Sequence, residues 1–415
     1  MAFPPIKSIE GHINIPSSKS EAQRALLIAA ISEHPIKIHL QEPSDDILAV
    51  IDLLSAIGFG IRKDTDNVEI YFFPAKQAKL TISARESGFA LRSLSSVAMH
   101  WTDELILTGE NTLQRRNFNE LINHLSMIGM EVQQTEEKLP LQISGHLTSG
   151  NFSFSASDSS QSISGILIAL SKLTTDSKIS LEKIVSFPYV QLTIDILRKF
   201  GYSIEQNGQD IQIKGNSSKG IPNFEVGGDW SSAAVWIAAG ALKGEIRLSG
   251  LSLQSSQSDR CIIEIIKKSG AHVFPTDKDI RVTKTLKKLK PIDVDLTDCP
   301  DLFPVLAIYS CGINGMSTFR SINRLKNKES NRLEAICEML RVFEVAFVIE
   351  NEILFIYGEG FIKGGFVDIY EDHRLVMAAA LASCISEYPI EINNEKVIGK
   401  SYKNFISHWK SCSTF

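Results

Sequence analysis

Long apolar stretches recur along the chain, and each one opens with charged or small polar residues. The clearest case begins at Glu371-Asp372-His373-Arg374 and continues as an apolar, alanine-rich run to Ala382. A helix that is apolar on every side must be buried on every side. Its polar start, with unpaired backbone N–H groups and the positive end of the helix dipole, is then the part that can meet an anionic ligand.

The same pattern recurs at intervals of about 70 residues, which indicates internal repetition. Polar starts precede apolar runs at six places: Lys19-Ser20, Gly88, Ser160-Gln161, Ser231-Ser232, Asp301 and Asp372. In between, amphipathic segments end at a glycine, or at Glu344 in the fifth copy, and alternating strand-like residues follow: Gly58, Gly129, Gly201 and Gly270. The pattern predicts an α/β fold of six repeats, each with a buried helix, an amphipathic helix and several strands. A long α/β enzyme with coincidental spacing is the alternative.

Length and composition narrow the class of protein. A chain of 415 residues is too long for one ordinary core, so we expect two domains, with a crossing near Gly227-Gly228. The net charge of −5 disfavours nucleic-acid binding. The six cysteines include no C-x-x-C pair, which favours reduced thiols over disulfides or a zinc site. No apolar run reaches about 18 residues and residues 1–11 lack an apolar signal core, so we expect a soluble cytoplasmic protein without a membrane span.

Cations and hydroxyls gather at the polar starts. Lys19 and Arg24, among serines, suit a phosphate or a carboxylate, although an ordinary helix cap would also explain the serines. Asp301 stands at the mouth of an apolar helix, where it is either a cap or a general base. The densest cluster runs from Arg324 to Arg332 and places four cations around Glu329, which is more than capping requires. The pair Arg115-Arg116 is either a solvated face or part of an anion site.

Taken together, these motifs resemble the 5-enolpyruvylshikimate-3-phosphate synthase family over essentially the whole chain. The motifs that carry the resemblance are Ser18-Lys19-Ser20 with Arg24, Ser159-Ser160-Gln161, Lys328-Glu329-Ser330-Asn331-Arg332, Asp372-His373-Arg374 and Lys400-Ser401-Tyr402. The family has the two-domain enolpyruvyl transferase fold, with three βαβαββ units in each domain. The resemblance implies one domain at 13–228, on the shikimate 3-phosphate side, and a second made of 1–12 and 229–415, on the phosphoenolpyruvate and catalytic-acid side.

The resemblance also implies an activity and a set of site residues. The chain would transfer the enolpyruvyl group of phosphoenolpyruvate to the 5-hydroxyl of shikimate 3-phosphate, as a monomer with no metal or organic cofactor. Asp301 would be the base, Glu329 the acid and Lys19 a further catalytic residue. Shikimate 3-phosphate would be held by Lys19, Ser20, Arg24, Ser159, Ser160, Gln161, Ser186, Tyr189, Asp301, Arg324 and Lys328. Phosphoenolpyruvate would be held by Lys19, Gly88, Arg116, Arg332, Arg374 and Lys400.

Departures from the family pattern leave alternatives open. The loop usually written Gly-Asn-Ala-Gly-Thr is Arg85-Glu86-Ser87-Gly88-Phe89 here, which predicts weaker binding of phosphoenolpyruvate and of glyphosate, the family's inhibitor. One alternative is the related transferase that uses UDP-N-acetylglucosamine, whose loop cysteine has no counterpart before Cys261. Others are an RNA 3′-phosphate cyclase, disfavoured by the acidic balance, and a non-catalytic relative that binds shikimate 3-phosphate.

Overall fold

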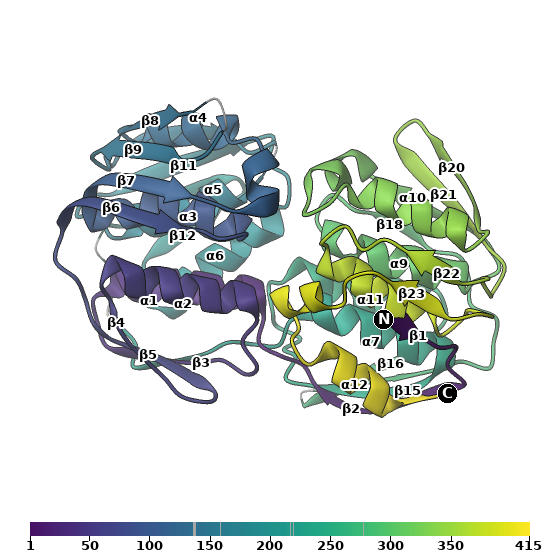
Figure 1. The fold of residues 1–415 in the computed structure, drawn as a ribbon. Coiled ribbons are helices and arrows are strands. Elements are labelled where there is room, and N and C mark those ends of the chain that lie inside the picture. The colour runs from purple at the N-terminus through teal and green to yellow at the C-terminus, as the bar shows by residue number, and fades with distance from the viewer. Residues whose placement is uncertain (136–137, 158, 216, 219, 277) are drawn as a thin grey trace. The chain divides into compact units, whose positions relative to one another are not determined.

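The chain folds into two compact units, and a computed structural model describes all residues except 136–137, 158, 216, 219 and 277 (Figure 1). We call Ser18–Val226 the N-terminal unit, and Met1–Ser17 together with Gly227–Phe415 the C-terminal unit. Both ends of the chain therefore belong to the C-terminal unit. Whether each unit binds the substrate assigned to it by resemblance stays a prediction.

Three buried helices form the centre of the N-terminal unit: α1 (Lys19–Ser32), α3 (Gly88–Val97) and α5 (Gln161–Ser171). Every residue of α1 from Glu21 to Ser32 is buried, because alanine, leucine and isoleucine occupy all its faces. At Gly165 of α5, a Cβ atom would lie 2.6 Å from the Cα atom of Ser93 in α3, so glycine permits this close helix contact. The amphipathic helices are α2 (Asp45–Ile57), α4 (Asn119–Met127) and α6 (Phe187–Lys199).

Each repeat of the N-terminal unit adds one four-stranded sheet, in which a parallel pair is extended by an antiparallel hairpin. The first has the order β14 (Asn223–Glu225), β3 (Ile36–His39), β5 (Asn67–Phe72), β4 (Gly60–Lys63). The second is β6 (Gln77–Ser83), β7 (Thr102–Thr108), β9 (Leu141–Gly145), β8 (Met130–Gln134). The third is β10 (Asn151–Ser155), β11 (Ser177–Glu182), β13 (Asp210–Ile213), β12 (Ile204–Asn207).

The C-terminal unit repeats this plan around the buried helices α7 (Trp230–Lys243), α9 (Phe303–Cys311) and α11 (His373–Ala382). Its other helices are α8 (Ile262–Lys268), α10 (Arg332–Val342) and α12 (Phe405–Cys412). One sheet is β16 (His272–Pro275), β17 (Asp279–Thr283), β15 (Gly244–Ser249), β2 (Ser8–Asn14), β24 (Ser413–Thr414). Another is β18 (Asp293–Asp295), β19 (Gly315–Arg320), β21 (Ile353–Gly358), β20 (Ala346–Glu350). In the sixth repeat β1 (Ala2–Phe3) takes the place of the hairpin, in the order β1, β23 (Ile390–Ile392), β22 (Gly365–Val367).

The predicted fold class and its six-fold repetition are confirmed. The polar starts fall at or just before the first residues of the six buried helices. The predicted glycines end amphipathic helices in the left-handed region, with φ of 114° at Gly58 and 97° at Gly270, and Glu344 at the fifth position adopts φ 59°. Within the described part of the chain, no helix is both long and apolar enough to cross a membrane.

Candidate active site

The start of α3 in the N-terminal unit faces two arginine side chains. Ser87 caps the helix through its hydroxyl. A Cβ atom placed on Gly88 would lie 2.4 Å from Arg116 Nη1 and 3.1 Å from Arg92 Nη1. Arg92 also donates to Gln161 Oε1 at 3.3 Å, while Arg116 Nε is buried with no hydrogen-bond partner among the described residues. Two guanidinium groups beside the N–H groups of a helix start can bind a phosphate or a carboxylate.

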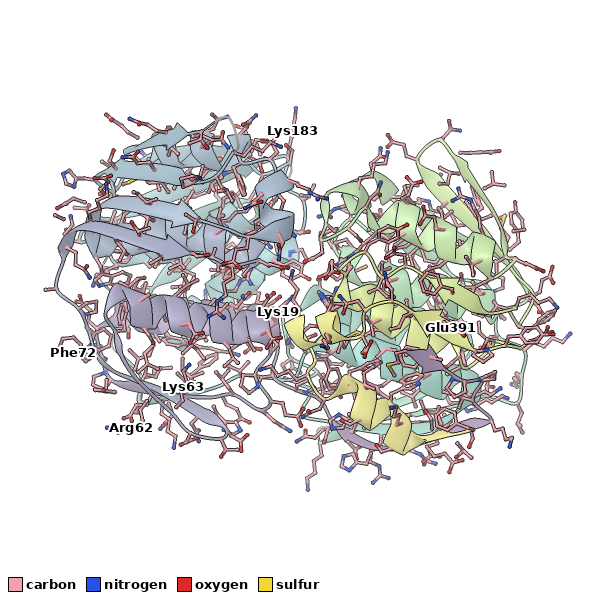
Figure 2. The ribbon with its side chains drawn as sticks, in the orientation of Figure 1. Lys19, Arg62, Lys63, Phe72, Lys183 and Glu391 are labelled. Carbon is pink, nitrogen blue, oxygen red and sulfur yellow. The ribbon has the colours of Figure 1, made fainter. Side chains whose placement is uncertain are left out.

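The first two turns of α1 supply two further cations. Lys19, labelled in Figure 2, has its Nζ atom 3.1 Å from Asp46 Oδ2. Arg24 is only 2 % exposed, and within the described chain it forms no ion pair with a carboxylate. Its nitrogens donate instead to Ser20 O at 2.9 Å, Thr193 Oγ1 at 2.8 Å and Ser164 Oγ at 3.1 Å. Burial lowers the pKa of Arg24 to about 10, so it remains a cation at neutral pH.

The starts of α5 and α6 bring other predicted residues near Arg24. Ser160 immediately precedes α5 and is buried. Ser186 precedes α6 and has a left-handed backbone with φ 55°, so the chain turns sharply there. The ring of Tyr189, in the first turn of α6, has its centroid 5.8 Å from Arg24 Cζ. Hydroxyls and a cation therefore share one end of the buried helices in this unit.

In the C-terminal unit, the side chain of Arg332 is held by three carboxylates. Its Nη1 atom lies 2.6 Å from Asp301 Oδ1, its Nη2 atom 2.6 Å from Glu329 Oε2, and its Nε atom 2.7 Å from Asp372 Oδ2. Asp372 is fully buried and also accepts a hydrogen bond from Ser330 Oγ at 3.1 Å. Burial alone would lower the pKa of Arg332, but these carboxylates raise it well above its ordinary value.

A second guanidinium group contacts the other oxygen of Asp301. Arg374 Nη2 lies 2.9 Å from Asp301 Oδ2 and donates to Ser231 Oγ at 3.0 Å, and Lys328 Nζ is 4.0 Å from Asp301 Oδ1. Burial acts to raise the pKa of Asp301, but Arg374, Arg332 and Lys328 outweigh it and hold that pKa far below its usual range. In this arrangement Asp301 is therefore an ionised carboxylate and a weak base.

A family model described as EPSP synthase (3-phosphoshikimate 1-carboxyvinyltransferase) matches residues 4–409. The chain belongs to the EPSP synthase family. The protein named 3-phosphoshikimate 1-carboxyvinyltransferase from Clostridium novyi (strain NT) is 34% identical over 414 residues, which cover 97% of this chain and 94% of that protein. The protein of that name from Brachyspira hyodysenteriae (strain ATCC 49526 / WA1) is 33% identical, with coverages of 97% and 96%.

Solved structures share the fold at lower sequence identity. An EPSP synthase from Acinetobacter baumannii superposes with a TM-score of 0.83 at 22% identity, covering 99% of this chain and 97% of that one. The enolpyruvyl transferase NikO from Streptomyces tendae gives a TM-score of 0.82 at 14% identity, with coverages of 99% and 96%. Because two different enolpyruvyl transferases superpose equally well, the fold alone does not decide the substrate.

The structure groups most of the predicted EPSP synthase site residues into clusters within each unit. In the C-terminal unit the cluster consists of Asp301, Lys328, Glu329, Arg332 and Arg374. Arg324 lies on the 3-10 helix Ile322–Asn327, which packs against α10, and Lys400 ends the 3-10 helix Lys396–Lys400, which packs against α11. In the N-terminal unit, Gly88 lies beside Arg116 and Arg92, Arg92 contacts Gln161, and the ring of Tyr189 lies near Arg24.

Three residues organise the arginines, although in the sequence they stand only as parts of polar helix starts or motifs. Asp372 caps α11 by accepting the Arg374 N–H at 3.0 Å while it holds Arg332. Ser330 supports Asp372, and Ser231 contacts Arg374. A usable signal was present for Asp372, because an aspartate directly before an apolar helix is a cap candidate and the arginines nearby need carboxylate partners.

Proposed function

We propose that this chain transfers the enolpyruvyl group of phosphoenolpyruvate to the 5-hydroxyl of shikimate 3-phosphate and releases phosphate. The observation that carries the proposal is the arrangement in the C-terminal unit. Asp301 and Glu329 both accept hydrogen bonds from the guanidinium group of Arg332, and Asp301 also accepts one from Arg374. Two carboxylates with convergent cations suit proton transfers on an anionic substrate. Family membership and relatives named 3-phosphoshikimate 1-carboxyvinyltransferase support the substrate pair.

The proposed binding residues follow the resemblance. Shikimate 3-phosphate is assigned to Lys19, Ser20, Arg24, Ser159, Ser160, Gln161, Ser186, Tyr189, Asp301, Arg324 and Lys328. Phosphoenolpyruvate is assigned to Lys19, Gly88, Arg116, Arg332, Arg374 and Lys400. The guanidinium groups beside Gly88 and the Arg332–Arg374 pair support the second assignment, since both are able to hold carboxylate or phosphate oxygens. Monomeric state and a cytoplasmic location stay predictions.

In the proposed reaction the 5-hydroxyl oxygen bonds to C2 of phosphoenolpyruvate while its proton passes to Asp301. A proton from Glu329 converts the methylene group into a methyl group and completes a tetrahedral intermediate. One methyl proton then returns to Glu329 as phosphate leaves and takes up the proton held by Asp301, which gives the enolpyruvyl ether. Because Arg332 and Arg374 hold these carboxylates, the anionic groups of phosphoenolpyruvate compete for the same guanidinium groups. Release from these ion pairs makes Asp301 a stronger base.

The deciding experiment measures phosphate release with both substrates and with each one omitted. Release that requires shikimate 3-phosphate and phosphoenolpyruvate together, with the enolpyruvyl ether detected by mass spectrometry, is the expected result. Release only when UDP-N-acetylglucosamine replaces shikimate 3-phosphate would assign the chain to the related transferase. Calorimetric binding of shikimate 3-phosphate without turnover would favour the non-catalytic relative.

Replacing Gly88 by Ala is expected to raise the KM for phosphoenolpyruvate by about tenfold, since the new methyl group displaces Arg116 from its present position. The obstacle is the end of a flexible side chain, so the free energy of unfolding should change by less than about 1 kcal/mol. Gly150→Ala is the control, because its nearest neighbour would be 3.5 Å away. An unchanged KM in the Gly88 variant would remove Arg116 from the phosphoenolpyruvate site.

The affinity for shikimate 3-phosphate is expected to fall above about pH 8. Burial lowers the pKa of Lys328 to about 8, although the charge of Asp301 partly offsets this, so the ammonium group loses its charge as the pH rises through that value. Lys328→Arg keeps the charge and should move the basic limb of kcat/KM for shikimate 3-phosphate to higher pH. The exposed Lys199→Arg serves as control. If the basic limb of kcat/KM lies at the same pH in the wild type and in Lys328→Arg, then the titration of Lys328 does not cause it.

Glu86→Asn is expected to lower both the KM for phosphoenolpyruvate and the inhibition constant for glyphosate. Glu86 lies two residues before Gly88, and its carboxylate accepts a hydrogen bond from the side chain of Asn111. Like charges at close range repel by up to a few kcal/mol at an effective dielectric constant of about 20. Steady-state kinetics with the exposed Glu131→Gln as control provides the test. If neither constant falls, the hydrogen-bonded carboxylate does not influence the anion site.

A further inference from the structure

Arg24 is a buried cation whose charge lacks a matching carboxylate among the described residues. Its three hydrogen bonds go to a carbonyl and two hydroxyl oxygens, all of them neutral. Taking a charge out of water is costly, and a buried arginine is normally stabilised by an opposite charge. Something else must therefore help to stabilise the guanidinium group before an anion arrives.

The ring of Phe89 occupies the face of that guanidinium group. Its centroid lies 4.4 Å from Arg24 Cζ, closer than the 5.8 Å to the ring of Tyr189. Phe89 is the second residue of α3 and only 6 % exposed, so the contact is shielded from water. Cation–π attraction is strongest at desolvated sites such as this one.

A ring on the face of the guanidinium group uses none of its N–H groups. Arg24 has five N–H donors, and three of them are engaged, namely Nε–H and one on each terminal nitrogen. The two others, one on each terminal nitrogen, make no hydrogen bond to the described residues and can serve an incoming anion. A carboxylate of the protein in place of the ring would neutralise the charge and compete with that anion.

We propose that Phe89 is a positioning residue for Arg24 and sets the affinity for shikimate 3-phosphate in this chain. The ring stabilises the buried cation and fixes its plane while leaving donors for an anionic group of the substrate. This inference rests on the proposed function, in which Arg24 contacts shikimate 3-phosphate. It also gives the loop Arg85-Glu86-Ser87-Gly88-Phe89 a second role, because Phe89 acts on Arg24 as well as lying next to Gly88.

The first test measures binding of shikimate 3-phosphate by calorimetry, together with both KM values. Phe89→Leu keeps an apolar side chain and removes the ring, and it is expected to weaken shikimate 3-phosphate binding by about tenfold. The KM for phosphoenolpyruvate, at saturating shikimate 3-phosphate, should change less than about twofold. Phe89→Tyr keeps the ring and should bind shikimate 3-phosphate as tightly as the wild type does. Phe224→Leu is the matched control, since that ring lies 5.8 Å from the ammonium group of Lys199.

The second test needs no substrate. A double-mutant cycle of Phe89→Leu and Arg24→Met, followed by urea unfolding, should show that the two substitutions are coupled by about tenfold in the unfolding equilibrium constant. Additive effects, or a Phe89→Leu variant that binds shikimate 3-phosphate like the wild type, would overturn the proposal. If the wild type does not bind shikimate 3-phosphate, the proposed function fails, whereas the cycle still reports on the Phe89–Arg24 contact.

Discussion

Replacing Glu329 by Gln is expected to lower kcat by about 10² to 10⁴, because an amide cannot deliver the proton that converts the methylene carbon into a methyl group. The amide oxygen can still accept a hydrogen bond from Arg332 Nη2, which lies 2.6 Å from Glu329 Oε2. Shikimate 3-phosphate affinity should therefore stay within about threefold of the wild type. Single-turnover kinetics and calorimetry measure the two quantities separately.

A matched control is Glu334→Gln, since Glu334 lies in the first turn of α10, which begins three residues after Glu329, but is exposed. It should leave kcat unchanged. The opposite pattern for Glu329→Gln, with turnover within about tenfold and a marked loss of stability, would make Glu329 an ion-pair partner of Arg332 and leave the acid to be found elsewhere.

Arg332→Met is expected to lower the free energy of unfolding by about 3 to 5 kcal/mol, the usual cost of leaving a buried charge without its partner. Asp372 is fully buried, and its 2.7 Å bond to Arg332 Nε would be lost together with the bonds to Asp301 and Glu329. Phosphoenolpyruvate binding should be lost as well, because Arg332 is assigned to that anion. Urea unfolding and calorimetry measure these two effects.

Two further variants test whether the loss of stability in Arg332→Met comes from the burial of its ion pairs or would follow from breaking any ion pair. Arg320→Met breaks the exposed pair with Asp293 and should cost no measurable stability. Asp372→Asn combined with Arg332→Met should recover part of the lost stability, because the uncompensated carboxylate is then gone. A single Arg332→Met variant as stable as Arg320→Met would contradict a structural role for the ion pair with Asp372.

Periodic features of the fold could be predicted from the sequence, whereas pairings between distant segments could not. Alanine-rich runs after polar starts predicted the buried helices, and Gly58 and Gly270 marked the helix ends, because both signals are local. The role of Asp372 depends on α10 and α11 bringing their first turns together, which no local pattern encodes.

The loop that ends at Phe89 is a second example of a contact that the sequence could not predict. In the sequence, Phe89 is only one residue of a loop that departs from the family pattern, whereas the fold places its ring against Arg24 of another helix. Likewise, the sequence suggested a base at Asp301 but could not show that Arg332 and Arg374 each hold one of its oxygens. Such contacts join residues far apart in the chain, so only the folded structure reveals them.

The pairing of β1 with β23 sets an order of events during synthesis. Ala2 lies opposite Glu391, which is labelled in Figure 2, so the first strand has no partner until nearly the whole chain has been made. At about 5 to 20 residues per second, that wait lasts roughly 20 to 80 s. The N-terminal unit is continuous from Ser18 to Val226, and it can fold on the ribosome while residues 1–17 remain unpaired beside it. Strand β1 therefore stays open to chaperones and proteases for longer than β2, whose partner β15 ends at Ser249.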